Sequence, residues 1–285
     1  MSSPAGSTQQ LPSAVRRAAL FTHGRPELLG NALERLERVA RECDVELVLS
    51  PEEAAKHNRA SALPAGADLG VVLGGDGTML RALKQFLGTR TPVLGVNFGR
   101  VGFLASIAAD ELEQGLMRAF AGEYRVFELP TLEAEVDGER RPAVNDVVAH
   151  GTALGRMVEL AWAVDGEDLG TVACDGIVCC TPSGSTAYNL SAGGPLLSWG
   201  LDAMAITFIA PHSLHARPLV VPRGGELVVL NRARAASVTV LVDGHSVADI
   251  ESDREMRVRL GEAKSLLATL PDRAFVRRYR ETFAS

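Results

Sequence analysis

One aspartate in a glycine-rich turn is the residue of this chain whose setting most clearly suggests chemistry. Residues 69–73 are apolar and rich in valine, as in a buried parallel strand, and residues 74–78 read Gly-Gly-Asp-Gly-Thr. Thr78 is the expected N-cap of a helix that carries apolar residues at helical spacing through Leu87. The free N–H groups and the dipole at such a helix start favour phosphate. Asp76 would lie beside that phosphate, where it could take a proton from an attacking hydroxyl or help to hold a metal ion.

A second stretch, residues 175–195, reads DGIVCCTPSGSTAYNLSAGGP and carries no charge after Asp175. Residues 177–180 have the length of a buried strand. The serines, threonines and glycines that follow allow a ligand to approach the backbone closely and offer hydroxyl and N–H groups. Tyr188, the one aromatic residue of the stretch, could provide a ring face for a base. The stretch therefore predicts a nucleotide pocket.

These two stretches, together with Asn145-Asp146, resemble the NAD kinase family in order and spacing, and the resemblance extends from about Ala18 onward. The glycine-rich turn also occurs in lipid kinases and phosphofructokinases, whereas the 175–195 stretch distinguishes this family. The resemblance implies ATP-dependent phosphorylation of the 2′-hydroxyl on the adenosine ribose of NAD, which gives NADP. Asp76 would be the general base, and magnesium or another divalent ion would bind through the phosphates of ATP. No dedicated set of metal ligands is expected in the chain.

The resemblance also implies which residues contact the nucleotides. Arg81 would meet a phosphate, Asn145 and Asp146 would bind ribose hydroxyls, and Asp175 would bind the nicotinamide or adenine part. Residues 186–191 would line the adenine pocket through main-chain groups and Tyr188. The family usually has Asn-Glu where this chain has Asn-Asp, so the carboxylate here is one methylene shorter. His245 occupies a position where the family frequently has glutamine. The complete set of expected binding residues is Gly74, Gly75, Gly77, Thr78, Arg81, Asn145, Asp146, Arg156, Asp175, Thr186, Ala187, Tyr188, Asn189, Leu190, Ser191 and His245.

Several of these residues also have a simpler structural interpretation. Asp76 and Asp175 could cap a turn or a strand end, and Arg81 and Arg156 could be ordinary solvated arginines. Tyr188 could be an aromatic side chain of the core. The cysteines show no Cys-x-x-Cys spacing, and three of the histidines fit no metal-ligand spacing with them, so neither zinc nor a disulfide is expected.

Composition excludes several classes of protein. The 285 residues suffice for one large domain or two ordinary ones, and 46% hydrophobic with 22% charged residues is typical of a soluble globular chain. A net charge of −6 argues against a nucleic-acid partner. No apolar stretch approaches a membrane span, no signal peptide is evident, and no ordinary P-loop occurs. A cytoplasmic protein with no membrane partner is expected.

The pattern of apolar residues divides the chain into an α/β half and an all-β half. Strand-like runs alternate with helical patterns up to about residue 121, which predicts a parallel sheet. The runs lie at 18–22, 45–49, 69–73 and 93–96, and the helices at 26–42 and 110–120. From residue 124 onward, short strands and Asp-Gly turns at 137–138, 165–166 and 243–244 predict hairpins and an all-β domain. The resemblance to the NAD kinase family implies that this domain is a β-sandwich.

A last helix at 272–283 is expected to pack back on the first domain, which would make the domains interleaved. The domain divisions expected from the sequence are a disordered leader at 1–15, an α/β domain at 16–122, an all-β domain at 123–270 and the returning helix at 271–285.

Three other functions fit parts of the sequence less well. A lipid kinase would share the glycine-rich turn, but the chain lacks an apolar or basic membrane-facing segment, and residues 175–195 would be unexplained. A non-catalytic NAD(P) sensor would not need Asp76. A dehydrogenase would need Gly-x-Gly-x-x-Gly after the first strand, which is missing. The sequence leaves open polyphosphate as a donor, NADH as an acceptor, and a homodimer or homotetramer as the assembly.

Overall fold

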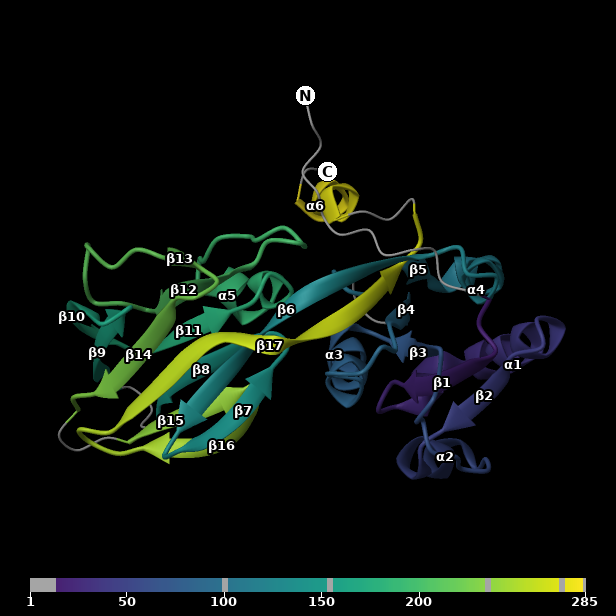
Figure 1. Ribbon diagram of the computed structural model, residues 1–285, viewed down its shortest axis with the longest axis horizontal. Helices are drawn as coiled ribbons and strands as arrows, with labels where there is room; N and C mark the ends of the chain where they lie inside the picture. The colour runs from purple at the N-terminus through teal and green to yellow at the C-terminus, as the bar shows by residue number, and fades with distance from the viewer. Residues whose placement is uncertain (1–13, 99–101, 153–155, 234–236, 272–274, 284–285) are drawn as a thin grey trace. The chain divides into compact units, whose positions relative to one another are not determined.

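The computed structural model describes residues 14–98, 102–152, 156–233, 237–271 and 275–283, and the chain divides into two compact units (Figure 1). The first unit consists of Met1–Glu128 and Ser265–Ser285, and the second of Leu129–Lys264. The chain passes from one unit to the other within two long strands, β6 (Arg125–Val136) and β17 (Glu255–Thr269). The sequence predicts these divisions after residues 122 and 270, close to the ends of the same two strands. Most of the expected leader, residues 1–13, lies outside the described residues.

The sheet of the first unit is parallel and has its strands in the order β2-β1-β3-β4. These strands are β1 (Arg17–Thr22), β2 (Glu46–Leu49), β3 (Leu69–Gly74) and β4 (Val93–Asn97), as the sequence predicts. β4 also pairs in parallel with β5 (Ile107–Ala108) and, at Leu267, with the end of β17. All six residues of β3 are buried, because strands inside a parallel sheet are covered on both faces.

Two helix predictions for the first unit need correction. The pattern at 26–42 is interrupted at Gly30, whose φ of 53° separates the short 3₁₀ helix η1 (Pro26–Leu29) from α1 (Ala32–Glu42). α3 (Asp76–Gln85) begins at Asp76 with Gly75 as its N-cap, so the prediction of Thr78 as the N-cap is wrong. The other predicted helices are η2 (Ala109–Glu111) followed by α4 (Leu112–Phe120), and α6 (Phe275–Phe283) at the end of the chain.

One helix of the first unit, α2 (Pro51–His57), is not predicted from the sequence. Its start nevertheless carries ordinary capping signals. Ser50 Oγ accepts the N–H of Glu53 at 3.3 Å, and Pro51 occupies the first helical position. The helix ends at Asn58, whose φ is 51°. At this length an apolar period has too few turns to be recognised.

The second unit consists of two antiparallel sheets (Figure 1). One has the order β13-β12-β11-β8-β15-β16, and the other has the order β10-β9-β14-β17 and continues with β6 and β7. Val147 and Ile177 of the first sheet share one hydrophobic cluster with Leu160 and Val258 of the second. This shared core confirms the predicted sandwich. The strands not yet given are β7 (Glu139–Ala143), β8 (Asp146–Gly151), β9 (Val158–Val164), β10 (Glu167–Cys174), β11 (Gly176–Cys180), β12 (Ala203–Ile209), β13 (Leu219–Pro222), β14 (Glu226–Asn231), β15 (Val238–Val242) and β16 (His245–Ile250).

Three hairpins of the second unit turn at the predicted Asp-Gly pairs. They join β6 to β7, β9 to β10, and β15 to β16. Asp137, Asp165 and Asp243 have φ values of 50°, 55° and 49°, and the glycine after each has φ between 78° and 81°. Two consecutive left-handed residues are what a type I′ turn requires, and this is why Asp-Gly is favoured there.

α6 belongs to the first unit, and the rings of its residues Phe275 and Phe283 lie near the ring of Phe103. The predicted fold class, an α/β unit and an all-β sandwich with a returning C-terminal helix, is therefore confirmed. Residues 272–274 of the predicted last helix lie outside the described residues. No helix in the described part of the chain is both long enough and apolar enough to span a bilayer.

Candidate active site

The site residues expected from the sequence fall into two groups that belong to different units. The glycine-rich turn and Arg81 lie in the first unit, at the end of β3 and along α3. The other residues, from Asn145 to His245, lie in the second unit.

Asp76 is the first residue of α3 and is partly buried. Its carboxylate accepts two backbone hydrogen bonds, from the N–H of Phe103 at 2.9 Å and from the N–H of Leu104 at 3.1 Å. A cap of the local turn, the simpler interpretation of Asp76, would bind its own helix instead. The sequence gives no sign of this contact, because the partners lie 27 and 28 residues further along the chain.

The glycines of the turn serve two different purposes. At Gly74 a Cβ would lie 2.6 Å from Oγ1 of Thr78, so strand and helix are close-packed here. Gly77 is exposed, with open space where a side chain would be. The N–H of Thr78 already bonds to the carbonyl of Gly75 at 3.0 Å, which leaves the N–H groups of residues 76 and 77 ahead of the first helical bond. Such groups can hold a phosphate.

Arg81 is held by acidic side chains of α2. Its Nη1 donates to Glu52 at 2.8 Å, and its Nη2 donates to Glu53 at 2.5 Å and to the carbonyl of Thr22 at 2.8 Å. Glu53 is 1% exposed and also accepts from the backbone and hydroxyl of Thr22 and from Lys56. A phosphate at Arg81 would have to compete with two carboxylates. The sequence does not predict this competition, because Glu52 and Glu53 lie on α2, the helix that is itself not predicted from the sequence.

The Asn145-Asp146 pair lies at the start of β8 and is fixed by Asp243. The Asp243 carboxylate accepts the N–H groups of Val144, Asn145 and Asp146 at 3.1, 2.7 and 3.2 Å. Sequence reasoning treats Asp243 only as the first residue of a hairpin turn, and its contacts span almost a hundred residues. Oδ1 of Asn145 is buried and has no hydrogen-bond partner among the described residues. A buried acceptor without a partner costs free energy, and a hydroxyl of a bound ligand could donate the missing hydrogen bond.

Asp146 is 6% exposed. Burial raises the pKa of its carboxyl to about 7, and the nearby charge of Asp243 acts in the same direction. Near neutral pH this group is therefore divided between an ionised form, which only accepts hydrogen bonds, and a protonated form that also donates one.

The 175–195 stretch folds against the Asn145-Asp146 pair. Thr181 donates its N–H to the carbonyl of Asn145 at 2.9 Å and its hydroxyl to the carbonyl of Val144 at 2.7 Å, and the hydroxyl of Ser183 reaches the same Val144 oxygen at 3.0 Å. At Gly184 a Cβ would lie 2.1 Å from the Asn145 oxygen, so only glycine fits. Two segments that the sequence associates by resemblance alone are thus in direct contact.

Residues 184–191 form two short helical turns, η3 (Gly184–Thr186) and α5 (Tyr188–Ser191). Asn189 is fully buried, and both ends of its side chain make hydrogen bonds, one inside the stretch and one to β12. Its Nδ2 donates to the carbonyl of Pro195 at 2.9 Å, and its Oδ1 accepts from the hydroxyl of Thr207 at 2.7 Å. The Asn189 side chain therefore holds the turn in place, and a contact of its main chain with the nucleotide stays a prediction.

Tyr188 is 37% exposed, so the interpretation as a core aromatic residue is wrong. Ser191 is also exposed, and Thr186, Ala187 and Leu190 are partly buried.

The remaining expected residues are Arg156, Asp175 and His245. Arg156 is exposed and follows residues 153–155, which are outside the described part of the chain. Asp175 joins β10 to β11, with its N–H bonded to the carbonyl of Ile209 at 3.0 Å. His245 is exposed, and its Nδ1–H donates to the carbonyl of Asp243 at 2.9 Å.

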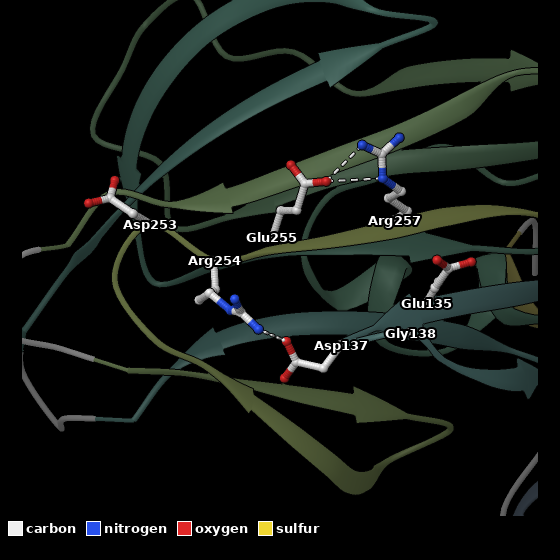
Figure 2. A pocket seen from close by; sticks show the side chains of 7 residues that line it. All are labelled: Glu135, Asp137, Gly138, Asp253, Arg254, Glu255 and Arg257. Atoms are coloured by element: carbon white, nitrogen blue, oxygen red, sulfur yellow. Dashed lines mark hydrogen bonds and ion pairs between the residues drawn. The ribbon is translucent and has the colours of Figure 1, made fainter.

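A hollow of about 290 Å³ in the second unit contains none of the expected residues (Figure 2). Its charges are largely paired with one another. Arg254 binds Asp137 at 2.5 Å and Arg257 binds Glu255 at 2.7 Å, as Figure 2 shows. The described residues contain no group of three or more His, Cys, Asp or Glu side chains arranged to hold a metal ion. The chemistry suggested by the sequence therefore stays with the glycine-rich turn and the Asn145-Asp146 region.

Comparison with known proteins identifies the family of this chain. The model of the ATP-NAD kinase N-terminal domain matches residues 31–124, and that of the ATP-NAD kinase C-terminal domain matches residues 144–270. A crystal structure of yeast NADH kinase complexed with NADH superimposes with a TM-score of 0.82 over 100% of this chain and 92% of that one, at 23% identity, and shows the same fold. An Archaeoglobus fulgidus NAD kinase in complex with ATP has a TM-score of 0.74 at 26% identity, covering 94% of this chain and 97% of that one.

Curated relatives agree with this assignment at higher identity. An NAD kinase of Gemmatimonas aurantiaca is 38% identical over 75% of this chain and 76% of its own length. An NAD kinase of Moorella thermoacetica is 40% identical over 74% of this chain and 69% of its own length. The two domain models include the glycine-rich turn and the 175–195 stretch in the residues they match. Together with these relatives they show that the chain belongs to the NAD kinase family.

Proposed function

We propose that this protein transfers the γ-phosphoryl group of ATP to the 2′-hydroxyl of the adenosine ribose of NAD, with Asp76 as the general base. Its family makes it a kinase that acts on NAD. In the proposed step the ribose 2′-oxygen attacks the γ-phosphorus, the bond from that phosphorus to the β,γ-bridging oxygen breaks, and ADP leaves. The hydroxyl proton passes to the carboxylate of Asp76, and the products are NADP and ADP.

The observation that carries this proposal is the position of Asp76 at the start of α3. Its carboxylate is oriented by two backbone N–H groups rather than buried in an ion pair. Each carboxylate oxygen has a further lone pair for a substrate hydroxyl. The glycine-rich turn around it has the N–H groups and the open space at Gly77 that phosphates of the donor require. Base and phosphate site would thus be adjacent.

The second unit supplies the proposed contacts to NAD. Asn145 Oδ1, buried without a partner in the described residues, would accept a ribose hydroxyl, and Asp146 would bind the neighbouring one. Tyr188 is exposed enough to receive the adenine ring. We retain as further proposed contacts Gly74, Gly75, Gly77, Thr78, Arg81, Arg156, Asp175, Thr186, Ala187, Asn189, Leu190, Ser191 and His245.

A divalent cation fits this proposal only as a partner of ATP. The described residues contain no group of three or more metal-ligating side chains. Magnesium bound through the β- and γ-phosphates would offset negative charge on the transferred group. By the same family resemblance, we propose a homodimer or homotetramer in the cytoplasm.

The experiment that tests the proposal measures NADP formation from NAD, ATP and Mg²⁺ by the purified protein, detected with an NADP-specific dehydrogenase. We expect turnover that requires all three components and that is absent with diacylglycerol as the acceptor. Binding of NAD or NADP without turnover would favour a sensor instead.

Asp76→Asn tests the role of the base in the same assay. The amide cannot accept the proton, so we expect kcat to fall by about 100-fold or more while NAD binding changes only a few-fold. Unchanged turnover would remove Asp76 from the mechanism.

A further inference from the structure

The carboxylate of Asp76 is oriented by residues 102–104. The N–H of Phe103 donates to Oδ2 at 2.9 Å and that of Leu104 to Oδ1 at 3.1 Å. Gly102 faces the same carboxylate so closely that a Cβ there would lie 2.4 Å from Oδ1. The backbone of this segment therefore forms a cradle around the carboxylate and sets its direction, while lone pairs on both oxygens stay available to substrate.

Phe103 is held in turn by α6, the last helix of the chain. Its carbonyl oxygen accepts a hydrogen bond from Nη1 of Arg278, whose side chain is 6% exposed. Its ring stacks on that of Phe283 at a centroid distance of 5.5 Å and lies 6.2 Å from the ring of Phe275. Phe103 thus donates its N–H to Asp76, while its carbonyl and its ring contact α6.

We propose that α6 positions the carboxylate of Asp76 for phosphoryl transfer, with Arg278 and Phe103 as positioning residues. The proposal rests on the function proposed above for Asp76. A general base works only within hydrogen-bond reach of the hydroxyl, and a misplacement of about 1 Å can cost about 100-fold in rate. Without Arg278, the carbonyl of Phe103 loses a charge-assisted hydrogen bond, and the N–H groups of the cradle are no longer held in one orientation. The fraction of enzyme with the carboxylate in its reactive position falls.

This chain of contacts predicts a particular kinetic signature for Arg278→Ala. We expect kcat per folded enzyme to fall by roughly 10- to 100-fold, while KM for NAD and for ATP changes by less than about 3-fold. Arg280→Ala, an exposed arginine on the same helix, is the matched control and is expected to keep the parent kcat. The folded fraction of each variant is measured by circular dichroism, and NADP formation is measured on the full chain.

A double-mutant cycle with Asp76→Asn separates positioning from a general structural effect. If Arg278 acts through Asp76, adding Arg278→Ala to Asp76→Asn leaves kcat within about 2-fold of the Asp76→Asn value, because the carboxylate to be positioned is already gone. The proposal would be overturned if Arg278→Ala lowered kcat by the same factor in the parent and in Asp76→Asn. A kcat for Arg278→Ala equal to that of the parent would also overturn it.

Two further results keep the test decisive. If Arg278→Ala does not fold, the cycle is run with Arg278→Lys, which keeps the charge but not the guanidinium geometry, and the same non-additivity is expected. If Asp76→Asn alone keeps the parent kcat, the failure belongs to the proposed function of Asp76, and the positioning role falls with it.

Discussion

At the scale of single residues, Tyr188 offers the most direct test of the proposed NAD contacts. It opens α5 and is 37% exposed, although its neighbour Asn189 is fully buried. Stacking of a base on an aromatic ring is worth about 1–3 kcal/mol. For Tyr188→Ala we therefore expect KM for NAD to rise by about 5- to 100-fold with kcat nearly unchanged, because the contact is equally strong in ground and transition states.

The control for this test is Tyr188→Phe, which keeps the ring and should keep KM close to that of the parent. Steady-state NADP formation at varied NAD concentration gives both constants. A fall in kcat without a rise in KM would show that Tyr188 does not bind the base.

Asp146 predicts a pH dependence of stability. Folding raises the pKa of its carboxyl from 3.8 to about 7, so between these values the folded chain carries a proton that the unfolded chain lacks. The free energy of unfolding therefore decreases as pH rises from about 4 to 7 and levels off above the folded pKa. Asp146→Asn removes this effect, so the variant should match the parent near pH 4 and exceed it by up to about 4 kcal/mol near pH 8.

Urea unfolding of parent and Asp146→Asn at pH 4, 6 and 8 measures this difference. Asp249→Asn, a substitution of an exposed carboxylate in β16, is the control. A constant difference between Asp146→Asn and the parent across this range would show that the carboxyl of Asp146 titrates normally.

At the scale of elements, the 175–195 stretch is held in place by hydrogen bonds within itself and to neighbouring segments. Asn189 ties α5 to Pro195 and to Thr207 of β12. Asn189→Ala leaves the buried hydroxyl of Thr207 and the partly buried carbonyl of Pro195 without that partner. We expect a loss of about 1–3 kcal/mol in the free energy of unfolding.

Ser198→Ala, an exposed position a few residues later, is the matched control and should change stability by less than about 0.5 kcal/mol. Denaturant unfolding monitored by circular dichroism checks both variants. If Asn189→Ala were as stable as the control, the turn would be maintained by contacts other than this amide.

At the scale of the whole molecule, the first unit is completed by the end of the chain. Leu267 of β17 pairs with Val93, and Ala268 and Leu270 are buried in the core of the first unit. Burial of the two leucines alone is worth about 3–6 kcal/mol, which is a large part of the stability of a domain. We expect residues 1–128 alone to unfold at much lower urea concentration than the same segment joined to residues 265–285 by a Gly-Ser linker.

Circular dichroism of the two polypeptides in urea measures the difference. The control is the joined polypeptide with Leu267 and Leu270 both replaced by serine. It should unfold at the same urea concentration as residues 1–128 alone. Equal midpoints for the segment with and without its native C-terminal residues would show that the first unit folds without them.

Much of this molecule follows from local sequence rules. The strands of the parallel sheet, the Asp-Gly hairpins and the glycine-rich turn each depend on the conformational preferences of a few adjacent residues. Local rules fail where two signals conflict or where a segment is short. Gly30 interrupts a segment that has a continuous apolar pattern of helical period. Gly75 is the N-cap of α3 in place of Thr78, so the helix begins at Asp76.

The sequence by itself determined the fold class, the family and the two segments on which the proposed chemistry depends, because these are properties of neighbouring residues. Only the tertiary structure decided which partners those segments have. Asp76 is oriented by Phe103 and Leu104, Arg81 is neutralised by Glu52 and Glu53, and Asn145 is fixed by Asp243. Such contacts join residues 27 to 98 positions apart. Their physical cause is the packing of strands and helices that bring distant polar groups together, and no local pattern encodes it.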